Sequence, residues 1–98
     1  GYVEQLEQDK NSVPSSNFII TDHAIFEMER RDISLELVQL ILEHPEQRLA
    51  IRKGRQVFQS RIEIGEKRYV VRIFVDIDRS PLEVVTVYKS SKIDKYWE

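Results

Sequence analysis

The stretch QVFQSRIEIGEKRYVVRIFVDI, residues 56–77, decides the fold, because apolar and polar residues alternate through both of its halves. Such alternation is typical of β-strands that bury one face. Gly65 and Glu66 interrupt the pattern and supply a tight turn. The stretch therefore predicts an antiparallel hairpin with one apolar and one polar face. We expect the apolar face to carry Phe58, Ile62, Ile64, Tyr69, Val71, Ile73 and Val75, and the polar face to carry Gln59, Arg61, Glu63, Arg68 and Arg72.

Two further strands flank this hairpin. QRLAI (residues 47–51) precedes it across the turn-like KGR, and LEVVTVY (residues 82–88) follows it after DRSP. Connections this short imply a four-stranded antiparallel meander. In the first flanking strand, alternation places Leu49 and Ile51 on the apolar side, and Arg48 and Arg52 on the polar side. The last strand is apolar on both faces, so it is predicted to be central and its faces are left unassigned.

Two helices precede the strands. Thr21 or Asp22 is suited to cap a helix over HAIFEMER, and Ser34 is suited to cap a second helix over LELVQLILEH. The second helix must end before Pro45, since proline cannot continue it. The residues of this helix that we expect in the core are Leu37, Val38 and Ile41.

These elements predict an α+β fold in which two N-terminal helices pack on a four-stranded antiparallel sheet as two layers. The fold is assigned to residues 18–98 as a single domain. Residues 1–17 contain the linker-like NSVPSSN and are predicted to be a flexible tail.

Composition narrows the class of protein. The 98 residues suit one domain, and they include no cysteine, which excludes disulfides and thiolate chemistry and favours a reducing, cytoplasmic location. No apolar run approaches the roughly 20 residues of a membrane span. His23 and Glu27 are spaced like a ligand pair but lack further ligands. We therefore expect no membrane contact, no metal and no cofactor.

The net charge of −2 hides a strong segregation. Residues 1–47 hold ten acids and three bases, residues 48–72 hold two acids and eight bases, and residues 73–98 hold five acids and four bases. The polar face of the predicted sheet is thus rich in arginine, which favours contact with phosphates. The alternative is a solvated face whose arginines pair with acids such as Glu63 and Asp76. The candidate RNA-binding residues are Arg31, Arg48, Arg52, Arg61, Arg68 and Arg72.

Three residues are candidates for proton transfer and charge stabilisation. His23 lies at the start of the first helix, one turn before Glu27, and is the candidate for a general acid or base. Tyr88 offers a proton and Lys92 a positive charge just beyond the last strand. Metal-free RNA cleavage needs a base, an acid and cations around the phosphorus. The alternatives are an ordinary surface histidine and a C-terminal segment that only packs back on the core.

The sequence resembles a family known as the domain of unknown function numbered 4258. That family typically shows HA, then RM, then RGIS ahead of a short helix, and a last strand close to TVY. The matching residues span roughly positions 18–90, and they are His23, Ala24, Met28, Arg31, Ile33, Ser34, Thr86, Val87 and Tyr88. Two positions depart from the pattern, since Glu27 stands where arginine is frequent and Asp32 where glycine is frequent.

The resemblance implies a RelE-like or barnase-like ribonuclease fold of bacterial toxins. It implies a metal-independent endoribonuclease of the mRNA-interferase kind, which acts as the toxin of a toxin–antitoxin pair, with RNA and an antitoxin protein as partners. Catalysis would then rest on His23, Tyr88 and Lys92. The alternative is a non-catalytic module that binds protein or RNA on the same fold. Oligomeric state is left open.

Overall fold

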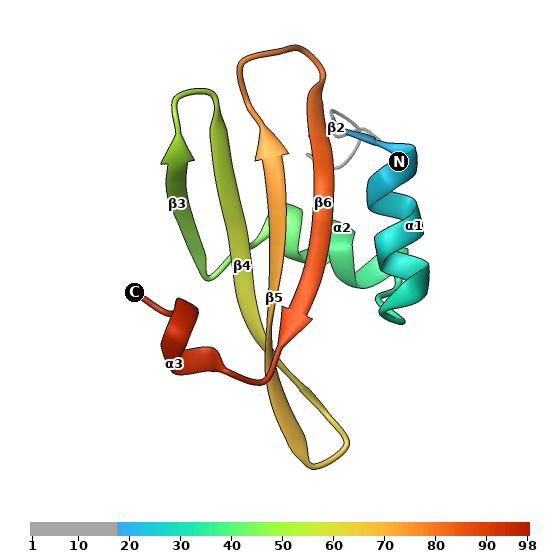
Figure 1. The fold of residues 1–98 in the computed structure, drawn as a ribbon, viewed down its shortest axis with the longest axis vertical. Coiled ribbons are helices and arrows are strands. Elements are labelled where there is room, and N and C mark those ends of the chain that lie inside the picture. Colours follow the sequence, from blue (N-terminus) through green and yellow to red (C-terminus); the bar gives the residue numbers. More distant parts are fainter. Residues whose placement is uncertain (1–17) are drawn as a thin grey trace, which may run out of the picture.

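The computed structural model describes residues 18–98, which form an α+β fold (Figure 1). The residues predicted to be a tail lie outside the described part of the chain. In chain order the elements are β2 (Phe18–Ile20), α1 (Asp22–Arg30), α2 (Leu35–Glu43), β3 (Gln47–Arg52), β4 (Arg55–Ile64), β5 (Lys67–Asp76), β6 (Leu82–Ser90) and α3 (Ile93–Tyr96).

The described strands form one mixed sheet of five strands in the order β2-β6-β5-β4-β3. The antiparallel meander β3–β6 is confirmed. The prediction of only four strands was wrong, because β2 pairs parallel to β6 with Phe18 opposite Leu82. Three residues are too few to show a period of two, and the backbone of Thr21 continues the pairing by donating to the Val84 carbonyl over 3.1 Å.

Side-chain caps begin both N-terminal helices. The Thr21 hydroxyl accepts a hydrogen bond from the Ala24 amide, and the Ser34 hydroxyl accepts one from the Leu37 amide, both over 3.1 Å. These bonds satisfy amides that a helix start leaves without partners. The cap at Ser34 was predicted, and of the two candidates Thr21 and Asp22 the structure selects Thr21.

The turn between the two helices is built around Asp32. Asp32 has a φ of 56°, in the left-handed region where glycine is favoured. Its amide donates to the Glu29 carbonyl over 3.3 Å, and the Ile33 amide donates to the Met28 carbonyl over 2.8 Å. This is a Schellman ending, and it buries Met28 against Ile33. Aspartate tolerates this conformation better than most residues.

The helix face of the sheet holds the main core. In Figure 1, α2 crosses behind the strands and α1 runs alongside β6. Val38 and Ile41 are buried as predicted, and Leu37 is half-buried. The buried residues of this core are Ala24, Met28, Ile33, Val38, Ile41, Leu42, Phe58, Val71, Ile73, Val75, Val84 and Val87.

The faces of β3 are opposite to the prediction over most of its length. Arg48 pairs with core residue Phe58, so Arg48 lies on the helix face, while Leu49 pairs with Val57 on the opposite, open face. The register then shifts between Ala50 and Arg52, which returns Arg52 to the open face. Alternation failed here because Val57 is fully buried on the open face, so apolar residues do not mark the helix face alone.

The C-terminal residues add a short helix that the sequence did not predict. The Trp97 amide donates to the Ile93 carbonyl over 2.9 Å, which closes α3. The Tyr96 carbonyl accepts a hydrogen bond from Gln59 on the open face, so α3 lies on the side of the sheet opposite to α2. Among residues 18–98, no helix is long and apolar enough to cross a membrane.

Candidate nucleic-acid interface

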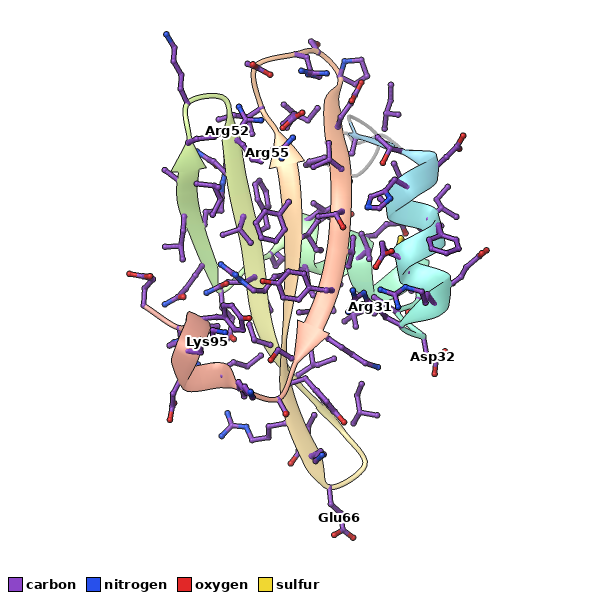
Figure 2. The ribbon with its side chains drawn as sticks, in the orientation of Figure 1. Arg31, Asp32, Arg52, Arg55, Glu66 and Lys95 are labelled. Atoms are coloured by element: carbon purple, nitrogen blue, oxygen red, sulfur yellow. The ribbon has the colours of Figure 1, made fainter. Side chains whose placement is uncertain are left out.

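Tyr88 lies at the centre of a group of polar and aromatic side chains on the open face. In the sheet register it is paired with Arg72, whose Nη1 donates to the Tyr88 hydroxyl over 2.7 Å. The Arg31 guanidinium lies 5.9 Å from the centre of the Tyr88 ring. Figure 2 shows Arg31 beside the lower half of β6. We call Arg31, Gln59, Arg72, Tyr88 and Tyr96 the Tyr88 cluster.

Arg72 is held from two sides. Its Nε donates to the Gln59 side-chain oxygen over 2.8 Å, in addition to the bond to Tyr88. Its guanidinium lies 4.4 Å from the Tyr96 ring centre and 5.3 Å from that of Phe74. A guanidinium has five N–H groups, and the remaining ones of Arg72 have no hydrogen-bond partner within residues 18–98. Arg72 is thus a cation that is held in place and keeps N–H donors for a ligand.

Arg31 is paired with Glu27, one turn earlier in α1. Its Nε donates to Glu27 Oε1 over 2.8 Å, and Arg30 donates to the same oxygen over 3.1 Å. Hydrogen bonds from Arg30 and Arg31 lower the pKa of Glu27, which is only 8% exposed. Glu27 is therefore ionised at neutral pH. It holds Arg31 in place and offsets part of its charge.

The Tyr88 hydroxyl is suited to give a proton. Burial raises its pKa, and the hydrogen bond from Arg72 opposes that rise in part. A phenol with a raised pKa is protonated at neutral pH, so it can donate but does not serve as a base. Its ring packs 5.7 Å from Phe74 and 6.0 Å from Tyr96, measured between ring centres.

The other two candidates for catalysis lie outside the cluster. His23 is exposed near the start of α1, where Thr21 bonds the Val84 carbonyl, and eight residues of helix, roughly 12 Å, separate it from Arg31. Lys92 is exposed before α3, where its backbone amide donates to the Ser90 hydroxyl over 3.0 Å. Within the described chain, no hydrogen bond or ion pair joins either residue to Tyr88 or Arg72.

Alternation correctly predicted the open face for four of the candidate RNA-binding arginines, but they are spread along the sheet: Arg52, Arg61, Arg68 and Arg72. Arg61 resembles Arg72 in lying against an aromatic ring, since its guanidinium is 4.2 Å from the Trp97 ring centre. It also forms an ion pair with Glu46 over 3.2 Å. That bond lowers the pKa of Glu46. Arg68 is exposed toward the β4–β5 turn, whose tip carries Glu66 in Figure 2.

The two arginines of β3 lie away from the Tyr88 cluster. Arg52 is near the β3–β4 turn at the opposite end of the sheet (Figure 2). Arg48 is on the helix face, where its guanidinium lies 4.4 Å from the Phe58 ring centre and bonds Gln56. The structure therefore brings Arg31 and Arg72 to Tyr88, and it separates Arg48 and Arg52 from that group.

The sequence did not single out Gln59, Phe74 or Tyr96 as site residues. Gln59 was placed correctly on the polar face, but nothing in the pattern marked it as fully buried. Tyr96 lies 24 residues after Arg72 in the chain, and only the path of the C-terminal segment brings the two together. An aromatic pair at the end of a polar segment was the one available signal.

Other parts of the molecule hold an ion pair and two hollows. Arg55 bonds Asp76 over 2.6 Å, and Arg79 extends this ion pair. Two hollows of about 300 and 340 Å³ lie beside the helices. Within residues 18–98, no three or more histidine, aspartate or glutamate side chains gather as metal ligands would.

Comparison of the chain with family models found no match, and searches of curated proteins and solved structures found no significant similarity. The resemblance carried by residues such as His23, Met28 and Tyr88 stays a prediction.

Proposed function

We propose that this domain binds unpaired RNA on the open face of its sheet and cleaves it as a metal-independent endoribonuclease. The observation that carries the proposal is the Arg72–Tyr88 hydrogen bond of 2.7 Å, with the Arg31 guanidinium 5.9 Å from the centre of the same ring. It joins a proton donor to two cations in one small area. Cleavage of a phosphodiester needs both functions close to the phosphorus.

The phosphate would bind at the guanidinium groups. Arg72 is anchored through Nε and Nη1, so its remaining N–H groups can meet two phosphate oxygens without losing the contacts that hold it. Arg31 is 34% exposed at its side chain and is directed by Glu27. Arginine forks match the geometry of phosphate oxygens better than ammonium groups do.

Aromatic rings beside these cations favour an unpaired strand over a duplex. Tyr96 and Trp97 are half-buried next to Arg72 and Arg61 respectively. Bases that are not paired can stack on aromatic rings and on guanidinium planes, which is how single strands are commonly bound. The arrangement therefore fits a nucleotide whose phosphate meets Arg72 and whose base meets a neighbouring ring.

The proposed reaction is transfer of the phosphate within the strand. The 2′-oxygen forms a bond to phosphorus, the bond from phosphorus to the 5′-oxygen breaks, and a 2′,3′-cyclic phosphate remains. Tyr88 gives its proton to the departing 5′-oxygen, while Arg72 and Arg31 stabilise the charge on the phosphorane. The 2′-hydroxyl proton passes to a base, and His23 is the residue proposed from the sequence. The toxin role and the antitoxin partner rest on the family resemblance alone.

A second function, RNA binding without cleavage, is favoured by the place of His23. That side chain is exposed and lies about two helical turns from Arg31. Within residues 18–98, no hydrogen bond or ion pair joins a histidine or carboxylate to Tyr88 or Arg72. The cations and rings would then serve binding alone.

The experiment is cleavage of an end-labelled, unpaired RNA oligonucleotide in excess chelator, with the same oligonucleotide carrying 2′-deoxyribose as a substrate control. Tyr88→Phe removes the proton and keeps the ring, so it should lower the rate about 10²–10⁴-fold. Tyr69→Phe is the matched control. Tyr69 is also half-buried beside a cation, 5.5 Å from Lys89, but it lies on the helix face opposite Ile62.

Equal rates for the two tyrosine variants would contradict the catalytic role of Tyr88. Binding that depends on Arg72, together with no cleavage by the wild type, would support the second function. A 2′,3′-cyclic phosphate product would support the first.

A further inference from the structure

Gln59 is an unusual residue on the open face, because it is polar and yet fully buried at 0% exposure. Each end of its amide has a partner. Its oxygen accepts from Arg72 Nε over 2.8 Å. Its nitrogen donates to the Gln47 side-chain oxygen over 2.7 Å and to the Tyr96 carbonyl over 3.1 Å. A buried amide that is fully bonded fixes its surroundings, because each broken bond leaves an unsatisfied group.

The same amide joins two parts of the molecule that are distant in sequence. Gln47 donates to the Glu98 carbonyl over 3.0 Å and accepts from the Glu98 amide over 3.3 Å. The C-terminal segment is thereby attached to β3 and β4 through two glutamines. Tyr96, on that segment, stacks on the guanidinium that Gln59 holds. The position of Arg72 and the position of the C-terminal segment therefore depend on one side chain.

We propose that Gln59 is a positioning residue for Arg72 and Tyr88: its oxygen directs the guanidinium, and its nitrogen secures the C-terminal segment that covers the guanidinium with Tyr96. This inference rests on the proposed function for its effect on RNA, but the positioning itself is a property of the free protein. Gln59 does not touch the RNA. It acts by holding Arg72 Nε, which keeps Nη1 on the Tyr88 hydroxyl.

A comparable pair on the helix face supplies the control. Gln56 accepts from Arg48 Nε over 3.0 Å and from Arg48 Nη2 over 2.8 Å, so it holds an arginine much as Gln59 does. Arg48 stacks on Phe58 and makes no contact with Tyr88. Replacing each glutamine by methionine keeps the length of the side chain and removes the amide.

The experiment follows three signals in Gln59→Met, Gln59→Glu and Gln56→Met. The first is the solvent protection of the Arg72 Nε proton in NMR spectra, assigned by its absence in Arg72→Lys. The second is the pKa of Tyr88 from its ring carbon signals, assigned with Tyr88→Phe. The third is the Kd for an unpaired RNA oligonucleotide.

Gln59→Met should remove the protection of the Arg72 Nε proton. It should lower the pKa of Tyr88, because loss of the Gln59 nitrogen releases the segment that helps to bury the ring, and burial is the largest cause of the raised pKa. It should weaken RNA binding about tenfold, the value of one charged hydrogen bond. Gln59→Glu retains an acceptor and should restore the protection of the Arg72 proton. Gln56→Met should change none of the three signals.

A purely structural role for Gln59 predicts a different result. If Gln59 only secured the C-terminal segment, Gln59→Glu would release that segment as Gln59→Met does, because neither variant keeps the donor to Tyr96, and the Arg72 Nε proton would lose its protection in both. Loss of protection in Gln59→Glu, or an Arg72 proton that stays protected in Gln59→Met, would overturn the proposal. A wild type that does not bind RNA would refute the proposed function, while the proton and pKa signals would still decide the role of Gln59. Should Gln59→Met fail to fold, the protection of the Arg72 proton in Gln59→Glu decides the same question.

Discussion

Each face of the sheet carries a glutamine that is hydrogen-bonded to an arginine, but the two arginines have different surroundings. On the helix face, Gln56 holds Arg48, and the arginine covers the edge of an apolar core. On the open face, Gln59 holds Arg72, and Arg72 in turn donates a hydrogen bond to the hydroxyl of Tyr88. Both pairs are a glutamine and an arginine on neighbouring strands, and both arginines stack on aromatic rings.

What separates the two arginines is the set of groups around them. The helix face is filled mainly by an apolar core to which α1 and α2 contribute. The open face is covered in part by α3 and keeps a connected set of polar groups around buried Gln59. An arginine count alone therefore does not identify a binding surface. The partners that fix each guanidinium do, and they favour the open face.

The largest effect should come from truncating the helix-side core. Ile41→Ala removes a side chain that is 1% exposed, and it should lower the free energy of unfolding by about 2–5 kcal/mol. Leu40→Ala, on the same helix at 56% exposure, should cost well under 1 kcal/mol. Denaturant titration of both variants measures the difference. Similar losses for the two variants would contradict the orientation of α2 that buries Ile41 and exposes Leu40.

A smaller effect is expected from the ion pair at the far end of the open face. Asp76 is 7% exposed and bonds Arg55, which lowers the pKa of Asp76. Asp76→Asn should cost about 1.5–3 kcal/mol at pH 7, the range for a hydrogen bond to a charged group.

The pH dependence of that cost has a definite sign. A lowered pKa in the folded state stabilises the protein above the unfolded value of 3.8, and this contribution disappears as the pH falls through the folded value. Unfolding measured from pH 7 to pH 2 should therefore show wild type and Asp76→Asn converging in acid. A gap that persists at pH 2 would show that the loss is due to packing and not to charge.

The smallest effect concerns the charge next to Arg31. Glu27 is ionised and shares its Oε1 between Arg30 and Arg31, so Glu27→Gln should raise the positive charge near Tyr88. We expect RNA affinity to increase about two- to fivefold, in keeping with a partly exposed ion pair. Glu36→Gln, an exposed residue of α2, is the control for a change in net charge. Weaker binding by Glu27→Gln would mean that holding Arg31 in place matters more than its charge.

The sequence predicted the architecture well where patterns are long. The hairpin of residues 56–77, the caps at Thr21 and Ser34, and the buried residues of α2 all follow from periodicity and capping chemistry. The prediction failed where the pattern is short, and where the open face of the sheet also buries apolar residues. Residues 18–20 are too few for a period. In β3 a bulge breaks the alternation, and buried Val57 draws Leu49 to the open face.

The candidate site was predicted in part. Tyr88 and Arg72 lie on strands whose pairing brings them together, and Arg31 is one turn from Glu27 as expected of a helix. Gln59 and Tyr96 join them through contacts between residues far apart in the chain, which a single sequence does not show. The separation of His23 from Tyr88 follows from the direction of α1 along β6, and this too depends on tertiary packing.

The most direct test of the open face as the RNA-binding surface compares Arg72→Gln with Arg48→Gln. The Kd for an unpaired RNA oligonucleotide is measured for both variants and the wild type over a range of salt concentrations. Arg72→Gln should weaken binding about tenfold and lower the slope of log Kd against log salt by about one phosphate contact. Arg48→Gln should leave both unchanged, since Arg48 lies on the helix face. Equal effects of the two substitutions, or none from Arg72→Gln, would contradict the assignment of RNA binding to the open face.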